Sequence, residues 1–433
     1  MNIRKHLNKF IFAAFITLAA ASLSFAQNAK TPNPRQEKLL NNLKLLMWQD
    51  AGGDKVSVKL RVHSGAAFDT LGKEGTMALL ADALFPGDSA KEFFAEELGG
   101  SVEVTSNYDY IQINATGSAD RILTILETIA AAVIRPVLDK ETTAKIKSAR
   151  LEKVKELEKN PAYVADLAVA KRLFGDYPYG RSAEGTPESL AKIDFADLLL
   201  AKQRFLTADN VTLAVSGNIK YDYVFKVVRQ LFGGWEKADK KVPATFAQPN
   251  APKNGMPVLN SPLEKTSEFR FALRGLSRND KDFYASQILK HILQNRLQTR
   301  EGKTAFVRQE SRVLPGYFLF GVSQWNVEGI KRDGDKIALP VTDGYQNNFL
   351  KEAIKQNEFG QAKTAFAAES NRNDVINSWL DADTFKLSSV KDDLQNAQNV
   401  TIADVQRVLE KSQKEAVAYI LVFTGEKQAT SNQ

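Results

Sequence analysis

Apolar residues recur along the chain at helical and strand spacings, in two series of elements. In the first series, alternation predicts a half-buried strand in KVSVKLRVHSGAAFD and two strands in SVEVTSNYDYIQINATG, while helical spacing marks GTMALLADALF and ADRILTILETIAAAVIRP. A charged helix follows in DKETTAKIKSARLEKVKELEKNP. In the second series, the strands EFRFALRGL and YFLFGVSQWNV flank the helix KDFYASQILKHILQNRLQTR. This grouping predicts an α+β fold of antiparallel-rich sheets, with helices mainly on one face of each sheet.

Two stretches far apart in the chain share one plan, which indicates a duplication. Residues 193–219, IDFADLLLAKQRFLTADNVTLAVSGNI, and residues 400–427, VTIADVQRVLEKSQKEAVAYILVFTGEK, each predict a helix, a turn and a strand. The two copies lie about 200 positions apart, the length of one ordinary domain. The corresponding residues are Asp197 with Asp404 and Gly217 with Gly425.

The duplication predicts two homologous domains, at residues 37–236 and 257–428. The stretch between them, residues 237–256, has little periodicity and lies in a proline-containing segment, as expected of a solvated linker.

The first 26 residues differ from the rest of the chain. Arg4, Lys5 and Lys9 precede an apolar run, and small residues around Ala26 offer a cleavage point. This pattern predicts a secretory signal peptide, because the run is shorter than the roughly 20 residues that a membrane span needs. The expected location is the bacterial periplasm or the exterior of the cell, with no membrane association after cleavage.

Composition narrows the chemistry further. The chain has no cysteine, which excludes disulfides, thiol nucleophiles and cysteine metal sites. The formal net charge of +7 falls to +4 without the three basic residues of the leader. Acidic and basic residues are interspersed throughout, so the charge does not predict nucleic-acid binding.

The short helix GTMALLADALFPG, residues 75–87, places three residues on one face. Ala78, Ala81 and Asp82 follow the i, i+3, i+4 spacing, which serves either metal binding or close packing. The sequence around this helix decides between the two.

Five segments resemble the insulinase/pitrilysin family of zinc metallopeptidases, which includes the mitochondrial processing peptidase subunits. They are GTMALLADALFPGDS, EELGGSVEVTSNYDY, DYPYGRSAEGTPESL and TADNVTLAVSGNI in the first half, and LQNRLQTREGKTAFV in the second. The resemblance covers most of the chain after the leader. It implies two related α+β domains per chain, and two chains or two linked halves that close around an extended peptide.

Active members of that family carry the inverted motif H-x-x-E-H on the first long helix and a glutamate about 75 residues later. The two histidines and the late glutamate hold zinc, and the glutamate within the motif acts as general base. On this pattern Ala78 and Asp82 stand at the histidine positions, Ala81 at the base and Glu156 at the third ligand. The resemblance therefore implies no catalytic residues and no cofactor here, with zinc expected only in a partner subunit.

Histidine content supports the loss of zinc independently. After the leader, the chain contains only His63 and His291, in different halves, so no pair at i and i+4 exists. His63 follows an alternating strand and is expected at a strand edge. Asp82 and Glu156 leave two interpretations open, a weak Mg²⁺ or Ca²⁺ site completed by water or a solvated pair of carboxylates.

Family members that lack the zinc motif supply an arginine and a tyrosine from the second domain to grip substrate, a role of the oxyanion-hole type. Here Arg300 stands at the arginine position, but Phe306 takes the tyrosine place and cannot donate a hydrogen bond. Tyr317, on the next strand, is a candidate replacement. Arg300 is either a substrate clamp or an ordinary surface residue.

Two functions follow from these observations. The first is an exported, catalytically inactive homologue that acts as the substrate-binding or regulatory subunit of a heterodimeric peptidase, with a zinc-bearing partner and an unstructured peptide as ligand. The alternative is a stand-alone or homodimeric peptide-binding or scaffold protein without a peptidase partner, which the departure at Phe306 favours.

Overall fold

The computed structural model describes residues 33–238, 246–250, 252, 256–260, 267–325, 332–333, 336–337, 350–370 and 374–423. The chain divides into residues 1–35 and one compact unit, residues 36–433. The predicted signal peptide and much of the predicted linker lie outside the described residues. No helix within the described ranges combines the length and apolarity needed to cross a membrane.

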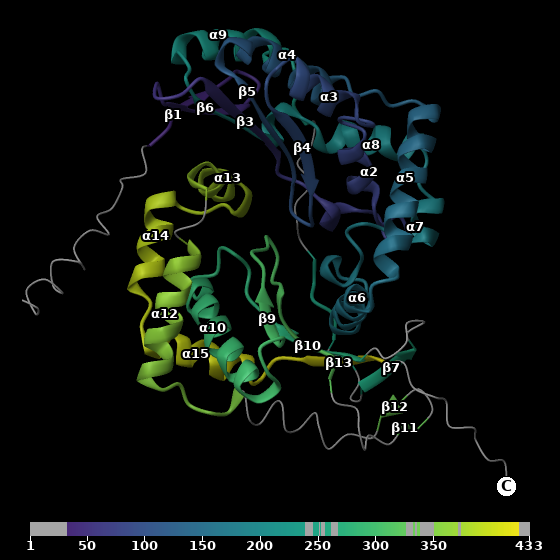
Figure 1. Ribbon diagram of the computed structural model, residues 1–433, viewed down its shortest axis with the longest axis vertical. Helices are drawn as coiled ribbons and strands as arrows, with labels where there is room; N and C mark the ends of the chain where they lie inside the picture. The colour runs from purple at the N-terminus through teal and green to yellow at the C-terminus, as the bar shows by residue number, and fades with distance from the viewer. Residues whose placement is uncertain are drawn as a thin grey trace, which may run out of the picture. The chain divides into compact units, whose positions relative to one another are not determined.

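The first sheet contains six strands in the order β1-β2-β6-β3-β5-β4 (Figure 1). The β2-β6 pair is parallel, whereas β6-β3, β3-β5 and β5-β4 are antiparallel. The strands are β1 (Arg35–Lys38), β2 (Lys44–Gln49), β3 (Lys55–Val62), β4 (Ser101–Ser106), β5 (Ile111–Ser118) and β6 (Val211–Gly217). The α-helices of this half are α2 (Thr76–Asp82), α3 (Ser89–Glu96), α4 (Ile122–Ile134), α5 (Lys140–Glu158), α6 (Pro161–Phe174), α7 (Pro187–Ala191), α8 (Phe195–Phe205) and α9 (Tyr221–Phe232).

The second sheet contains seven strands in the order β11-β12-β7-β13-β8-β10-β9. The strands are β7 (Met256–Asn260), β8 (Ser267–Arg274), β9 (Phe306–Gln309), β10 (Tyr317–Ser323), β11 (Arg332–Asp333), β12 (Lys336–Ile337) and β13 (Val417–Phe423). The α-helices are α10 (Phe283–Glu301), α12 (Gln356–Ser370), α13 (Val375–Phe385), α14 (Val390–Asn399) and α15 (Ile402–Ser412).

The two sheets repeat one topology. The run β2-β6-β3-β5-β4 of the first sheet corresponds to β7-β13-β8-β10-β9 of the second, and each run starts with its parallel pair. The helices before β6 and β13 start alike, because Asp197 and Asp404 each close a capping box at the third helical position. The predicted two-domain α+β fold is therefore confirmed. Gly425, the predicted end of the second copy, lies outside the described residues.

Strand alternation decides which face of the first sheet is apolar. In β3, Val56, Val58 and Leu60 are buried in a core that α4 and α9 help to form. The intervening residues Lys59 and Arg61 point to the other face, since successive side chains of a strand alternate. Helices α4 and α9 follow one face of the sheet in Figure 1.

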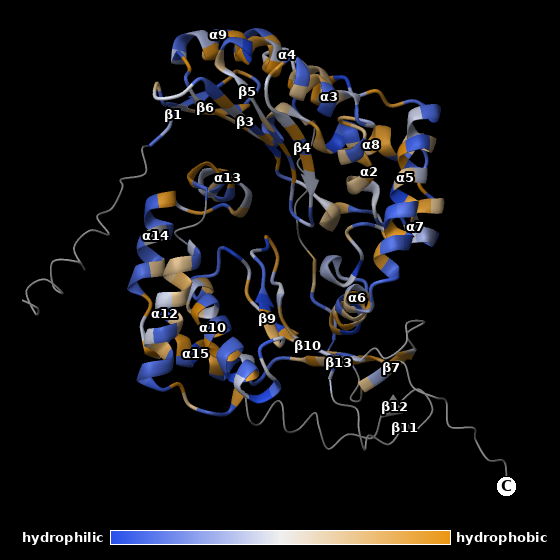
Figure 2. Ribbon diagram, in the orientation of Figure 1, coloured by the Kyte–Doolittle hydropathy of each residue, from blue (hydrophilic) through white to orange (hydrophobic). Residues whose placement is uncertain are grey.

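Helix α6 belongs to the first half in sequence but packs on the second sheet. Its buried residues Ala165, Val169 and Leu173 share an apolar cluster with Ala272 of β8 and Ile420 of β13. The opposite face of these strands contributes to the core under α10 and α15. Figure 2 shows hydrophobic residues along β13, as expected of a strand covered on both faces. The halves are thus interlocked through α6.

The segment DYPYGR, residues 176–181, makes a second connection between the halves. Tyr179 is 1% exposed, and its hydroxyl donates to Asp109 Oδ1 at 2.9 Å in the turn between β4 and β5. The same hydroxyl accepts from the backbone N–H of Leu314 at 2.9 Å. The aromatic residues of this turn therefore have a structural role.

Candidate functional site

The sequence places the degenerate zinc motif on helix α2. This helix starts at a glycine in the left-handed conformation. Gly75 has a φ of 93°, and a side chain here would touch Leu190 and the backbone of Glu184. A buried carboxylate outside the helix binds its first N–H groups, since Asp69 accepts from Gly75 N at 2.7 Å and from Met77 N at 2.9 Å. Asp69 therefore fixes the start of α2.

The face of α2 that bears Ala78 and Asp82 is covered by Arg150 of α5. The guanidinium donates to Asp82 Oδ1 at 2.6 Å, to Asp82 Oδ2 at 2.9 Å and to the Ala78 carbonyl at 3.2 Å. It also pairs with Glu184, which Lys153 contacts at 2.9 Å. The Arg150 side chain is only 5% exposed. A permanently charged group therefore occupies the face where the sequence pattern places a metal.

Two opposing effects act on the Asp82 carboxyl. Burial raises the pKa of Asp82 above its ordinary value, while the charge and hydrogen bonds of Arg150 act in the opposite direction. The carboxylate is stabilised only while the guanidinium remains beside it.

Ala81, at the predicted general-base position, is 4% exposed and belongs to the core of the first half. Its side chain packs among apolar groups and not against water. Close packing is therefore the role of this position, the second of the two uses that the spacing allowed.

The predicted third ligand, Glu156, is not part of this site. It lies on α5 six residues beyond Arg150, which on a helix is roughly 240° further around and about 9 Å further along. Its side chain is 69% exposed and binds Lys159 at 2.5 Å. The structure therefore does not bring Asp82 and Glu156 together as a cation site: Asp82 binds Arg150, and Glu156 is a solvated carboxylate.

The residues present do not fit a zinc ion. Among the described residues, no three His, Cys, Asp or Glu side chains come together as a metal site. Asp82 and Glu184 already share the positive charge of Arg150, so a metal would have to displace a buried guanidinium. The arrangement stabilises the fold and supplies no hydrolytic group.

Strand β4 forms one edge of the first sheet and lies beside α2. Within the described part of the chain, only β5 pairs with β4, so its outer backbone groups face away from the sheet. An edge strand of this kind can accept an extended peptide as an additional strand.

The structure does not bring Arg300, Phe306 and Tyr317 into one group. Arg300 lies in the last turn of α10, on the face of the second sheet that α10 covers, and pairs with Glu301 at 3.0 Å. Phe306 and Tyr317 belong to the apolar cluster on the opposite face. The arginine and the aromatic residues therefore lie on opposite sides of the sheet.

The surroundings of Phe306 and Tyr317 explain what each ring does. The guanidinium groups of Arg270 and Arg308 lie 5.0 and 4.8 Å from the centre of the Phe306 ring, a cation–π arrangement. The Tyr317 ring packs edge-on against Phe174 of α6 at 5.6 Å, and burial raises the pKa of Tyr317 to about 12. Both rings are part of the packing between the halves.

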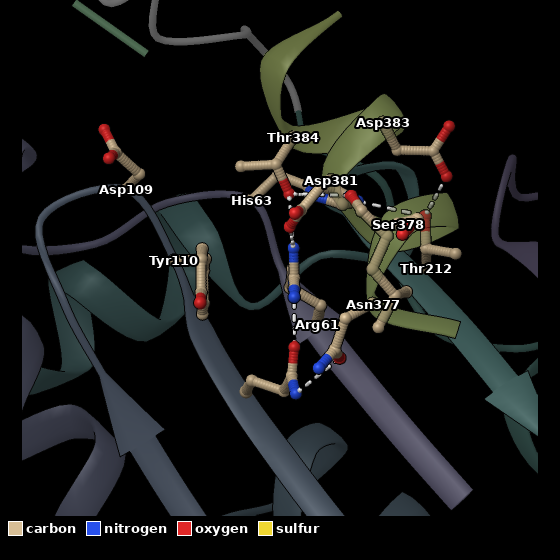
Figure 3. A network of polar contacts seen from close by, with 12 residues as sticks. Arg61, His63, Asp109, Tyr110, Thr212, Asn377, Ser378, Asp381, Asp383 and Thr384 are labelled. Atoms are coloured by element: carbon tan, nitrogen blue, oxygen red, sulfur yellow. Dashed lines mark hydrogen bonds and ion pairs between the residues drawn. The ribbon is translucent and has the colours of Figure 1, made fainter. Parts of the chain in front are cut away.

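A second cluster of polar residues lies on the other face of the first sheet (Figure 3). We call this face, which is opposite α4 and α9, the inner face. Arg61 of β3 is at its centre and is 1% exposed. Its guanidinium donates to Gln112 Oε1 at 2.6 Å and to Asp381 Oδ1 of α13 at 2.5 Å, and it lies 4.0 Å from the centre of the Tyr110 ring. One arginine therefore joins β3 and β5 to α13.

His63, two residues beyond Arg61, also joins the sheet to α13 (Figure 3). Its Nε2 lies 2.9 Å from Thr212 Oγ1 of β6, and its Nδ1 lies 3.0 Å from Thr384 Oγ1 of α13. Burial lowers the pKa of His63 to about 4, although the charge of Asp383 acts against this. The neutral ring has one donor nitrogen, and it donates to one of the two hydroxyls, since Thr212 and Thr384 donate their own hydrogens to Asp383 and to the Leu380 carbonyl. His63 directly follows the last residue of β3, and its ring therefore links the sheet to α13.

Sequence reasoning missed Arg150 and the contacts of α13. For Arg150 a signal existed, because it falls between Ile146 and Val154 on the buried stripe of α5, where a charge needs a partner. No such signal existed for α13, because its contacts with β3 join residues about 320 positions apart in the sequence.

Comparison with known proteins gives matches over most of the described chain. Residues 44–187 match the family described as "Insulinase (Peptidase family M16)", and residues 192–323 match "Peptidase M16 inactive domain". An "Uncharacterized zinc protease" of Rickettsia felis is 23% identical over 53% of this chain and 56% of its own length. The "Non-peptidase homolog YmxG" of Helicobacter pylori is 23% identical over 52% of this chain and 50% of its own length. The chain thus matches about half the length of these curated relatives.

Among solved structures, the fold matches the peptidase M16 inactive domain from Pseudomonas fluorescens. The TM-score is 0.77 at 19% identity, over 92% of this chain and 99% of that one. At this identity the likeness concerns the fold.

Proposed function

The chain belongs to the insulinase family, peptidase family M16, as an inactive homologue, and from this premise we propose that it binds peptide without cleaving it. Its proposed role is the substrate-binding or regulatory subunit of a heterodimeric peptidase, in which a zinc-bearing M16 subunit performs hydrolysis. Members of the family commonly pair with a second M16 subunit.

The observation that carries the proposal is the ion pair of Arg150 with Asp82. A zinc peptidase needs three neutral or anionic protein ligands and an open coordination position for water. Here a buried cation is hydrogen-bonded to the helix instead, at 2.6 and 2.9 Å from the two carboxylate oxygens. The proposed peptide surface, the outer edge of β4, does not depend on zinc chemistry.

The edge of the first sheet supports peptide binding. Strand β4 has its outer backbone groups available next to α2, and main-chain hydrogen bonds to an added strand do not require the lost catalytic side chains. An unstructured peptide is the proposed ligand, because it can adopt an extended conformation without losing a fold of its own.

Export to the periplasm or the cell exterior is part of the same proposal. It rests on the basic, apolar and small-residue pattern of residues 1–26. We propose zinc only in the partner, and no nucleic-acid or membrane ligand for the exported chain.

A second candidate is a stand-alone or homodimeric peptide-binding or scaffold protein. Phe306 favours it, because this ring lacks a hydrogen-bond donor and packs against the guanidinium groups of Arg270 and Arg308. A subunit that assists a catalytic partner through this position would need a donor there.

The test uses the purified chain and an unstructured peptide with a fluorophore and a quencher. Alone, the chain should raise the peptide's fluorescence anisotropy and release no fluorescence by cleavage, with or without EDTA. Mixed with the zinc-bearing M16 subunit of the same organism, it should accelerate EDTA-sensitive cleavage. Chelator-sensitive cleavage by the chain alone would overturn both candidates, and partner cleavage that is unchanged without this chain would leave only the second.

A further inference from the structure

Helix α13 covers the inner face of the first sheet although it belongs to the second half (Figure 1). It contacts β6, and its hydrogen bonds reach β2, β3 and β5 as well. The inner face consists of basic and neutral polar residues around a small apolar centre. Its members that touch α13 include Lys44, Lys59, Arg61 and Thr212 and the apolar Leu46 and Trp48.

The charges of α13 match those of the inner face one to one. Asp383 lies 2.7 Å from Lys44, Asp381 lies 2.5 Å from Arg61, and Asp374 pairs with Lys59. The three cations have side chains 31%, 2% and 12% exposed, so two of them are largely removed from water by the helix. Without α13, the inner face would present three positive charges close together.

An apolar contact lies between the ion pairs. Leu380 of α13 is completely buried with Leu46, Trp48 and Ala214 of the sheet, and the rings of Trp48 and Trp379 meet edge-on at 6.4 Å. This cluster is separate from the large cores of both halves. In Figure 2, α13 accordingly shows hydrophobic residues beside hydrophilic ones. Release of the helix would expose a small cluster and leave the two main cores intact.

We propose that α13 is a built-in ligand of the inner face, and that this face binds acidic peptide segments with a large apolar side chain when α13 is released. The proposal rests on the peptide-binding function above and identifies the class of peptide and its internal competitor. The helix supplies the pattern that such a peptide needs, three carboxylates around a tryptophan and a leucine, within DVINSWLDADTFK, residues 374–386. Ion pairs supply selectivity for acidic segments, and the apolar centre adds affinity.

The experiment compares binding of a fluorescein-labelled peptide DVINSWLDADTFK to three full-length proteins. They are the wild type, the variant Asp374→Lys/Asp381→Lys/Asp383→Lys, and the control variant Asp88→Lys/Asp120→Lys/Glu156→Lys, which changes exposed carboxylates of the first half by the same total charge. The first variant places lysines against Lys44, Lys59 and Arg61 and should release α13. Far-UV circular dichroism and thermal unfolding establish that each protein is folded.

The released variant should bind the labelled peptide at least about tenfold more tightly than the wild type and the control. Addition of Lys44→Glu and Lys59→Glu to the released variant should abolish the gain, because these residues carry the partner charges. A peptide with asparagine at its three aspartate positions should show no gain. Equal binding by all three folded proteins would overturn the proposal.

A second probe separates this proposal from the proposed function. The binding of an unstructured peptide without acidic residues is measured for the same three proteins. If it binds all of them while the acidic peptide shows no gain, peptide binding stands and the role of α13 is refuted. If neither probe binds any protein, the peptide-binding function fails, and the role of α13 fails with it.

Discussion

The guanidinium of Arg150 contacts both carboxylate oxygens of Asp82, at 2.6 and 2.9 Å, on the helix to which the sequence pattern assigns the degenerate zinc motif. A side-chain cation thus lies beside the positions where the inverted motif would hold a metal ion. The charge is permanent and part of the fold, whereas a metal can be removed by a chelator.

Replacement of Arg150 by methionine should destabilise the protein by about 2–3 kcal/mol. Loss of one partner of a buried ion pair typically costs about 3–5 kcal/mol, and the lower value is expected here because Asp82 and Glu184 are 35% and 27% exposed. Urea unfolding at pH 7 measures the change. Lys155→Met is the control, since the partner of Lys155 in the described part of the chain is the exposed Glu152, and it should cost less than about 0.5 kcal/mol. Equal effects of the two substitutions would contradict the prediction.

Three substitutions should create a zinc site on α2. Ala78→His and Asp82→His restore the imidazole pair, and Arg150→Glu replaces the cation by a third ligand. After dialysis, this triple variant should retain about one zinc ion per chain by mass spectrometry of metals. The double variant that keeps Arg150 should retain little, because the guanidinium occupies the same face. Stoichiometric zinc in the wild type would refute the account of this helix.

The contact between α13 and the sheet should weaken in acid. The pKa of His63 is about 4 in the folded protein against an ordinary value of 6.5, because burial disfavours the charged ring. Asp383 acts against this shift, whereas Arg61 and Lys44 reinforce it. The unfolded chain therefore binds more protons between these values, so the stabilisation is complete above about pH 6.5 and is lost as the pH falls toward 4.

Titration of His63 changes the free energy of unfolding by at most about 1.4 kcal/mol per pH unit. Urea unfolding of the wild type and of His63→Gln between pH 7 and pH 4.5 measures it. The glutamine can still bond to the neighbouring threonines, and its variant should lose less stability over that range. Parallel curves for the two proteins would show that His63 does not titrate there.

Tyr179→Phe should cost about 1–3 kcal/mol and leave peptide binding unchanged. The hydroxyl bonds to Asp109 Oδ1 and to the N–H of Leu314, each at 2.9 Å, and both partners would remain buried without it. Thermal unfolding and the anisotropy assay measure the two quantities. Tyr223→Phe, at an exposed tyrosine of α9, is the matched control. A loss of peptide binding at unchanged stability would assign Tyr179 to the ligand site.

Much of the fold could be predicted because local patterns determine it. The alternation around Val58 and Leu60 identifies a strand with one apolar face, and the equivalent positions of Asp197 and Asp404 identify the duplication. These signals involve neighbours in sequence, so they remain visible without a structure.

The candidate site was predictable only in part, because it depends on packing between distant elements. Ala78 and Asp82 share a face by helical spacing alone, but their partner depends on how α5 rotates against α2. Glu156 was selected by its distance along the sequence from the motif, whereas the residue on the buried face of α5 is Arg150. The pairing of Arg61 with Asp381 had no local signal at all, since either residue alone is an ordinary surface charge.

The docking of α6 on β8 and β13 also bears on how the protein is made. Strand β13, which completes its partner surface, ends at Phe423, 249 positions after Phe174 at the end of α6 (423 minus 174). During synthesis the apolar stripe of α6 is therefore made long before the strand that covers it. A premature stop codon that removes β13 would consequently harm both halves of the protein.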